Sequence, residues 1–172
     1  MTWIMVDIEA DGPCPADFSM VCFGAVVVEP GLSRTYYGGL IKPVSDKWIP
    51  EAIAVSGFTR EQAQAGRAPA DVMAEFVAWL KGLRGQPRFV SDNNCFDWQF
   101  VNWYLWHFTG GNPFGHSSTN LGSLYKGLVR QMSKNFKHLR KTGHDHNPLN
   151  DAIGNAEAML QLKELGLAIK FD

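Results

Sequence analysis

Three segments whose residues favour β-strands lie within the first 42 residues, ahead of any helical pattern. This order of strands before helices restricts the fold more than any other feature of the chain. They are residues 3–8, 20–29 and 34–42. Apolar, β-branched and aromatic residues dominate these segments, as is typical of strands. Gly12 and Pro13 indicate a loop between the first two. We therefore expect the chain to begin with an antiparallel meander.

Helical patterns dominate the remainder of the chain. Helices are expected from Pro50, from Thr59, and over residues 69–83, 96–108, 121–132 and 148–165, with a short strand at Phe89 and Val90 and a loop over residues 109–120. This order predicts a single domain over residues 1–172. Its class is α/β: a mixed β-sheet, with the antiparallel meander joined by parallel strands, flanked by helices.

Two acidic residues end the first predicted strand. Asp7 and Glu9 are two positions apart, so the alternation of a strand directs both side chains to one face of the sheet. Two carboxylates on one face carry a cost in desolvation and repulsion, which a divalent cation would offset. The alternative is a strand end that lies in water.

Two further acids lie at predicted helix starts. Asp97 falls in the first turn of the helix at 96–108, and Asp151 follows the start of the last helix, with His146 just before that helix. An acid near a helix N-terminus is favoured by the helix dipole and alone needs no function.

Together these residues form an ordered set that resembles a known family. Asp-x-Glu at 7–9, Asn-x-x-Phe-Asp at 93–97 and His-x4-Asp at 146–151 resemble the DnaQ-like 3'-5' exonucleases of the DEDDh subgroup, which includes RNase T, oligoribonuclease and proofreading subunits. The resemblance covers roughly residues 3–165. It implies an RNase H-like fold and a metal-dependent 3'-5' exonuclease that acts on single-stranded nucleic acid and releases nucleoside 5'-monophosphates.

The resemblance also implies roles for individual residues. Asp7, Glu9, Asp97 and Asp151 match the family's catalytic acids, which bind two ions, Mg²⁺ or Mn²⁺. His146 matches the catalytic general base, which also contacts the substrate. His144 lies seven positions before Asp151, a spacing that does not fit the family pattern.

Substrate contacts are implied at five further positions. Ala10 and Gly12 lie in the loop that contacts the terminal nucleotide, Asn93 and Phe96 belong to the second motif, and Phe58 matches an apolar residue that packs against terminal bases. Either phenylalanine could instead be an ordinary core residue. The chain departs from the family at Ala10 and Asp11, where threonines are usual, and at Ser56 and Asp92, where histidines are usual. These departures leave the substrate preference open.

Basic residues are concentrated in one segment. Residues 126–144 contain Lys126, Arg130, Lys134, Lys137, Arg140 and Lys141 and no acidic residue, although the whole chain has a net charge of -1. The segment is either a solvated helix face or a strip that holds upstream phosphates.

The remaining features concern assembly and compartment. The aromatic helix at 96–108 is either packed into the core or part of a homodimer interface. Cys14, Cys22 and Cys95 have no spacing typical of a disulfide framework, which favours a reducing, cytoplasmic compartment. No apolar run is long enough to span a membrane, so we expect no membrane partner.

Two other functions remain open at the level of sequence. The chain could be a catalytically silent module that binds nucleic-acid ends, or a nuclease restricted to very short oligonucleotides. RNA is slightly favoured over DNA as the substrate, because no second domain is appended.

Overall fold

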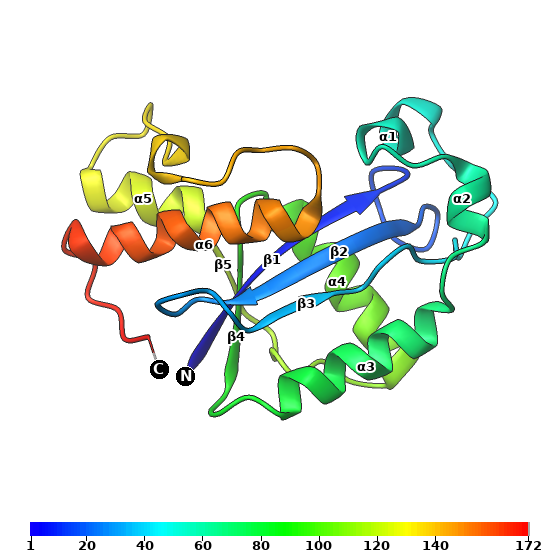
Figure 1. Cartoon of the computed structure of the whole chain (residues 1–172), viewed down its shortest axis with the longest axis horizontal. Helices are drawn as coiled ribbons and strands as arrows, with labels where there is room; N and C mark the ends of the chain where they lie inside the picture. The colour runs from blue at the N-terminus through cyan, green and yellow to red at the C-terminus, as the bar shows by residue number, and fades with distance from the viewer. Residues whose placement is uncertain (172) are drawn as a thin grey trace.

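The computed structural model describes residues 1–171 and contains one mixed sheet covered by helices on both faces (Figure 1). The strands are β1 (Thr2–Ala10), β2 (Met20–Val27), β3 (Thr35–Tyr37), β4 (Pro87–Ser91) and β5 (Ser118–Asn120). The α-helices are α1 (Pro50–Val55), α2 (Arg60–Gln64), α3 (Pro69–Lys81), α4 (Asn94–Thr109), α5 (Leu121–Val129) and α6 (Pro148–Glu164), and η1 (Lys137–Leu139) is a 3₁₀ turn.

The sheet has the order β3-β2-β1-β4-β5. β1 pairs with β2, and β2 with β3, in antiparallel orientation, whereas β4 runs parallel to both β1 and β5. The expected α/β class, with an antiparallel meander joined by parallel strands, is therefore confirmed. The central position of β1 places its carboxyl end beside the beginnings of the helices that follow β4 and precede the C-terminus (Figure 1).

Alternate residues of the central strands enter two separate cores. Ile4, Val6 and Ile8 pack with α3 and α4 on one face of the sheet, whereas Met5 and Val26 pack with α5 and α6 on the other. β1 is apolar on both sides because helices cover both faces of the sheet.

The structure corrects three predicted boundaries. Residues 118–120, expected to be loop, form the edge strand β5, whose polar Ser-Thr-Asn sequence gives little strand signal. The third strand is regular only over Thr35–Tyr37, because Gly39, at φ +67°, departs from the strand conformation. Helix α5 ends at Val129, since Arg130 adopts a left-handed conformation.

Helix α4 packs most of its aromatic side chains against the core. Phe100 and Tyr104 are fully buried, and Trp98 and Trp103 pack partly against the same cluster, while Trp106 is 53% exposed. Core packing thus accounts for most of the aromatic stretch, and the homodimer stays a prediction.

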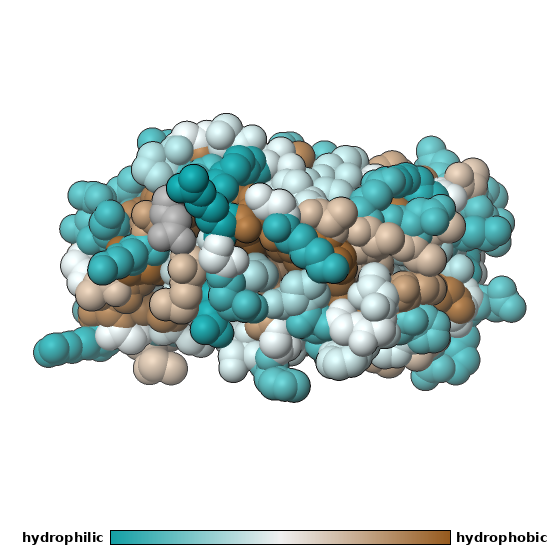
Figure 2. All heavy atoms as spheres, turned by 90° about the horizontal axis from the view of Figure 1, so that it is seen from below, coloured by the Kyte–Doolittle hydropathy of each residue, from teal (hydrophilic) through white to brown (hydrophobic). Residues whose placement is uncertain are grey.

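The surface shows no extended apolar area on the face that carries the chain termini. Figure 2 shows this face with hydrophobic patches broken up by hydrophilic residues. Within residues 1–171, no helix has the length and apolar character needed to cross a membrane. The three cysteines, all within this range, are free thiols.

Candidate active site

The carboxyl half of β1 carries Asp7 and Glu9 on the face of the sheet that α6 covers. Met5 lies two positions before Asp7 and belongs to the core beneath α6, so the alternation of the strand brings both acids to that side. Glu9 is 9% exposed and Asp7 is partly exposed. The pair expected from the sequence thus lies on a largely buried surface, and not on a strand end in water.

A glycine in the neighbouring strand lets α6 begin directly against the sheet. Gly24 of β2 is paired with Asp7 of β1. A Cβ atom at position 24 would lie 2.4 Å from the Cα atom of Leu149, far inside van der Waals contact. Only glycine therefore permits the first turn of α6 to lie this close to the acids of β1.

Asp151 lies in that first turn and is fully buried. Asn147 caps the helix, since its side-chain oxygen accepts hydrogen bonds from two backbone amides of the first turn. Carboxylate oxygens of Asp7, Glu9 and Asp151 lie within 4.8 Å of one another. Two segments separated by most of the sequence therefore meet at one point.

Asp97 supplies the fourth carboxylate from the first turn of α4. It is 2% exposed, and its Oδ2 atom has no hydrogen-bond partner among residues 1–171. Its charge is close enough to raise the pKa of Asp7. The position expected from the Asn-x-x-Phe-Asp motif thus joins the same cluster.

Burial and mutual repulsion disfavour the charged forms of Asp7, Glu9 and Asp97. Burial raises the pKa of Asp97 to about 8, and burial followed by the charge of Asp151 raises the pKa of Glu9 to about 7. The pKa of Asp7 is raised well above its usual range, first by burial and then by Asp97, Asp151 and Glu9. A cluster of oxygen ligands with an unpartnered buried oxygen fits a hard divalent cation, which would stabilise the ionised carboxylates.

A buried arginine from the basic segment also reaches the cluster. Arg140 donates from Nη2 to Oδ1 of Asp151 over 2.7 Å, and its side chain is 8% exposed. It also donates to the backbone carbonyls of Thr142 and Gly143. Its guanidinium rests on Gly154 of α6, where a Cβ atom would lie 2.5 Å from Nε. The helix thus has a glycine in its interior at the point where Arg140 packs. Glycine in a helix interior is less stable than alanine by roughly 0.5–1 kcal/mol.

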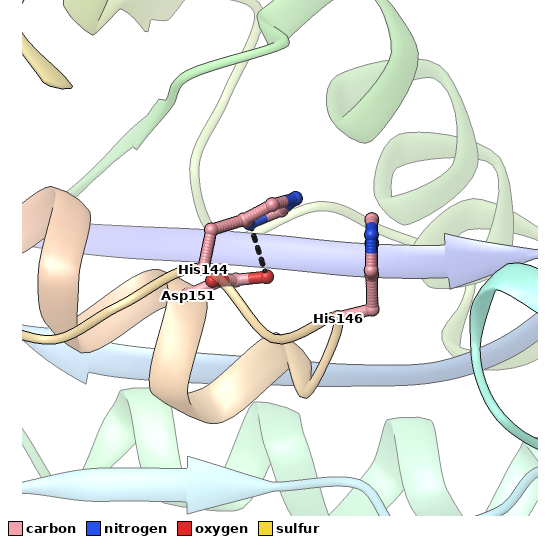
Figure 3. A group of neighbouring side chains, drawn as sticks. All are labelled: His144, His146 and Asp151. Atoms are coloured by element: carbon pink, nitrogen blue, oxygen red, sulfur yellow. Dashed lines mark ion pairs between the residues drawn. The ribbon is translucent and has the colours of Figure 1, made fainter.

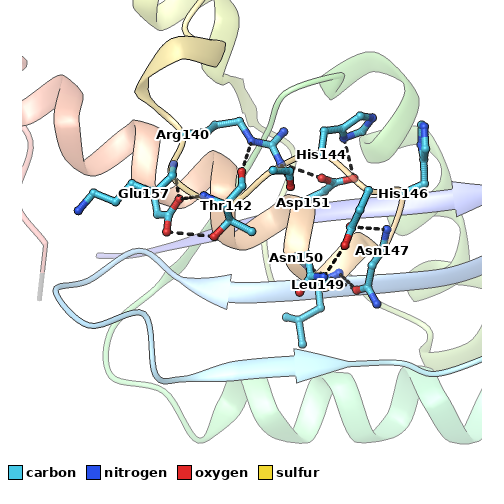
Figure 4. A network of polar contacts seen from close by, with 12 residues as sticks. Arg140, Thr142, His144, His146, Asn147, Leu149, Asn150, Asp151 and Glu157 are labelled. Carbon is cyan, nitrogen blue, oxygen red and sulfur yellow. Dashed lines mark hydrogen bonds and ion pairs between the residues drawn. The ribbon is translucent and has the colours of Figure 1, made fainter.

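The segment that leads to the histidines is fastened to α6 at a second point (Figure 4). Glu157 accepts hydrogen bonds from the backbone amides of Lys141 and Thr142, both over 2.7 Å, and from the Thr142 hydroxyl over 3.1 Å. Arg140 and Glu157 together hold the residues just before the His-containing turn against the helix that carries Asp151.

Two histidines face this cluster. His146 adopts φ +60°, which is uncommon outside glycine, and its Nδ1 atom lies 3.7 Å from Oε1 of Glu9. His144 places its Nδ1 atom 2.7 Å from Oδ2 of Asp151 (Figure 3). Both rings are about half exposed, with side-chain exposures of 46% for His146 and 53% for His144. His144, which the family spacing sets aside, therefore makes the closer contact with an acid of the cluster.

Asp11, where the family usually has threonine, is a fully buried structural carboxylate. It accepts hydrogen bonds from the amide of Ser19 over 2.5 Å and from Nη1 of Arg60 over 2.6 Å. Arg60 also donates to the carbonyl of Ser45, and the backbone amide of Ile49 donates to the Asp11 carbonyl. The buried ion pair ties the loop after β1 to the start of α2, and the Ile49 amide ties the same loop to the segment that leads into α1.

The two tied segments form the walls of an apolar pocket of about 420 Å³ next to Glu9. It is lined by Glu9, Ala10, Gly12, Pro13, Ile49, Ala52, Val55 and Phe96. A Cβ atom at Gly12 would lie 2.0 Å from the ring of Phe18, so a larger residue there would have to displace this ring. Three of the expected substrate contacts, Ala10, Gly12 and Phe96, thus line one cavity.

The other two expected contacts lie elsewhere. Phe58 packs against a small core cluster that includes Val21 and Ile53, and Asn93 is exposed at the start of α4. Neither lines the apolar pocket. Ile49 and Val55, which are 37% and 47% exposed, line the pocket without having been predicted from the sequence. The sequence gives only a weak signal for these two residues: both are apolar, and they stand at the two ends of the short helix α1.

Comparison with known protein families and curated proteins gives two matches. The family model RNase_T, described as exonuclease, matches residues 4–159. The 3'-5' DNA exonuclease Cap18 of Escherichia coli is 32% identical over 182 residues, which cover 99% of this chain and 96% of that protein.

Solved structures share the fold. A full-length 3'-exonuclease matches with a TM-score of 0.75 at 16% identity, over 98% of this chain and 84% of that chain. Pop2p of S. pombe, with Mg²⁺ and Mn²⁺ bound, matches with a TM-score of 0.70 at 14% identity, over 99% and 86%. E. coli exonuclease I with a dT13 oligonucleotide matches with a TM-score of 0.66 at 18% identity, and the match covers 95% of this chain but 41% of that one. The architecture is thus that of RNase H-like exonucleases.

Proposed function

The chain belongs to the exonuclease family that the RNase_T model describes and is a 3'-5' exonuclease, and we propose that it shortens single-stranded DNA from the 3' end, one nucleotide at a time. The observation that carries this proposal is the meeting of four acids from β1, α4 and α6 beside a pocket with apolar walls. The proposed products are nucleoside 5'-monophosphates.

Divalent metal ions are required by the family, and the acid cluster suits them. We propose that Asp7, Glu9 and Asp151 hold one ion and that Asp97 helps to hold a second, with Asp7 shared. Mg²⁺ and Mn²⁺ are the candidates, since both prefer oxygen ligands. When bound, such ions supply electrostatic stabilisation of the charge that develops on the phosphate and on the leaving oxygen.

His146 is proposed as the general base. Its ring is about half exposed and lies beside Glu9, so it can accept a proton from a water molecule that approaches the phosphate from solvent. The hydrogen bonds of Arg140 and Glu157 hold the preceding segment, which limits the movement of the histidine relative to Asp151.

The apolar pocket is proposed to hold the terminal nucleoside. Phe96, Ile49 and Val55 offer apolar surface for a base, and Glu9 in the same wall joins the pocket to the acid cluster. A base paired in a duplex cannot enter such a cavity without unpairing, which favours single-stranded ends. Contacts of this kind contribute about 1–3 kcal/mol per base.

The exposed cations of the basic segment are proposed to hold upstream phosphates. Arg130, Lys134, Lys137 and Lys141 are exposed, whereas Arg140 is committed to Asp151. The first four can therefore contact a strand that leaves the site, and binding should weaken as salt rises.

DNA is the proposed substrate because the E. coli relative, which matches nearly the whole chain, is named as a DNA exonuclease. The slight preference for RNA drawn from the sequence had only the lack of an appended domain behind it. Recognition of a 2'-hydroxyl would distinguish the two, and both belong in the same assay.

The experiment is a time course with 5'-labelled single-stranded DNA and RNA of several lengths, each with Mg²⁺, with Mn²⁺ or with a chelator. We expect a ladder that shortens from the 3' end of DNA, that stops with chelator, and that is absent for Asp7→Asn. Release of nucleoside 5'-monophosphates is measured by chromatography.

Other outcomes point to the other functions. Binding of DNA ends without cleavage by the metal-loaded protein would indicate a silent end-binding module. Cleavage confined to oligonucleotides of a few residues would indicate a nuclease for short fragments, and faster degradation of RNA would reverse the proposed substrate.

A further inference from the structure

Asp151 belongs to two overlapping groups of metal-ligating atoms. In one, carboxylate oxygens of Asp7, Glu9 and Asp151 lie within 4.8 Å of one another; in the other, ring nitrogens of His144 and His146 and an oxygen of Asp151 do so. The first group offers oxygen alone. The second offers two imidazole nitrogens and one oxygen, so the two groups suit different metals.

Imidazole selects for borderline transition metals. Mg²⁺ prefers oxygen ligands, whereas Zn²⁺ takes histidine nitrogen and carboxylate oxygen at about 2.0–2.2 Å, commonly with water in a fourth position. His144 Nδ1 is already 2.7 Å from Asp151 Oδ2. The ring centroids of His144 and His146 are 4.3 Å apart, in an edge-to-face arrangement. Small side-chain movements therefore complete a set of three ligands.

The turn that carries the histidines is built to hold them. Asp145, between them, accepts hydrogen bonds from the amide of Asn147 over 3.0 Å and from the side chain of Asn150 over 2.8 Å. Both histidine rings are about half exposed, so an ion can reach them from solvent and keep one water ligand (Figure 3).

We propose that His144, His146 and Asp151 form an inhibitory site for Zn²⁺ or a similar borderline metal. Its consequence for activity rests on the proposed function. Zinc in this site would occupy a ring nitrogen of His146, the proposed general base, and an oxygen of Asp151, a proposed ligand of Mg²⁺. Mg²⁺ would compete with zinc only for Asp151, because the imidazoles bind Mg²⁺ poorly.

Binding is tested directly on the whole chain. Zn²⁺ is titrated by calorimetry in saturating Mg²⁺, and Co²⁺ is titrated as a spectroscopic probe whose visible absorption reports low coordination number and nitrogen ligands. The variants are His144→Ala and, as the matched loss of one imidazole elsewhere, His116→Ala, whose side chain is exposed. Circular dichroism verifies that each variant is folded.

We expect one Zn²⁺ per chain, and a loss of Zn²⁺ affinity of at least about tenfold in His144→Ala, since even indirect partners of a metal ligand contribute that much. His116→Ala should bind as the parent does. Inhibition by Zn²⁺, normalised to each variant's own rate in Mg²⁺, should shift by the same factor as the affinity.

Equal Zn²⁺ affinity in His144→Ala and the parent would overturn the site, as would zinc that supports catalysis instead of inhibiting it. The binding measurement is independent of the proposed function. A chain that binds Zn²⁺ through His144 but never shortens DNA would refute the exonuclease proposal and leave the site standing.

Discussion

Replacing Gly24 with alanine tests whether the close approach of α6 to the sheet sets the position of Asp151. The new Cβ atom would lie 2.4 Å from Leu149 Cα and 2.5 Å from Leu149 N. Both are backbone atoms, so no side-chain rotation can relieve the contact. Carbon atoms in ordinary contact are about 3.5–4.0 Å apart, and the start of α6 must therefore move by about 1 Å.

A shift of that size acts on Asp151 because it lies in the same helical turn, two positions after Leu149. A displacement of about 1 Å at a reacting site can lower the rate by about 10²-fold. Overpacking in a dense core also costs about 1–3 kcal/mol in stability. We therefore expect Gly24→Ala to remain folded, with a lower melting temperature, weaker Mn²⁺ binding and a rate about 10²-fold lower.

Gly127→Ala is the matched control. Gly127 lies inside α5, no atom lies within 4 Å of the position of its Cβ, and alanine there should stabilise the helix by roughly 0.5–1 kcal/mol without change in rate. Initial rates on single-stranded DNA, Mn²⁺ calorimetry and thermal unfolding are measured for both variants below their melting temperatures. A Gly24→Ala protein with the parent's rate and Mn²⁺ affinity would refute the argument that this contact positions Asp151.

Three further predictions concern the charges of the site. His146→Ala should lose about 10²–10⁴-fold in rate yet bind Mn²⁺ in calorimetry as the parent does; a parental rate would contradict its role as base. Burial raises the pKa of Glu9 to about 7 and that of Asp97 to about 8, so the metal-free fold holds more protons than the unfolded chain. Its melting temperature should therefore fall as pH rises from 5 through about 8, and Mn²⁺ should reduce this fall; a rise instead would show that the acids are ionised without metal. Arg140→Gln leaves Asp151 without its buried partner and should cost about 3–5 kcal/mol in urea unfolding of the metal-free protein, a loss that Mn²⁺ should partly reverse.

Local patterns in the sequence predict the architecture well where strands and helices are long and periodic. The apolar run at residues 3–8 predicts a strand, and the period of two of a strand places both acids on one side; the structure has β1 in that form. β5 could not be predicted, because its three polar residues form a strand only through pairing with β4. Tertiary pairing, and not intrinsic preference, decides such short edges.

The candidate site is predictable in its acids but not in its supports. The resemblance to the DnaQ-like exonucleases singles out Asp7, Glu9, Asp97 and Asp151, and the structure brings them together; their catalytic roles stay proposals. Nothing in the sequence couples Asp11 to Arg60, because a buried ion pair between residues 49 positions apart has no local signal. The same holds for Arg140. In the sequence it is one residue of the basic segment, and only the fold shows that its side chain is buried against Asp151.

Helix α6 is made after all five strands of the sheet, and it carries Asp151. Chains grow at roughly 5–20 residues per second, so on the order of ten seconds separate the synthesis of Glu9 from that of Asp151. In that interval the nascent chain holds two of the four acids until Asp97 is made and three from then on, and the surface of β1 and β2 that α6 will cover is still open. Until α6 docks, the acid cluster lacks Asp151. Under the proposed function, the capacity for hydrolysis therefore arises only with that docking step.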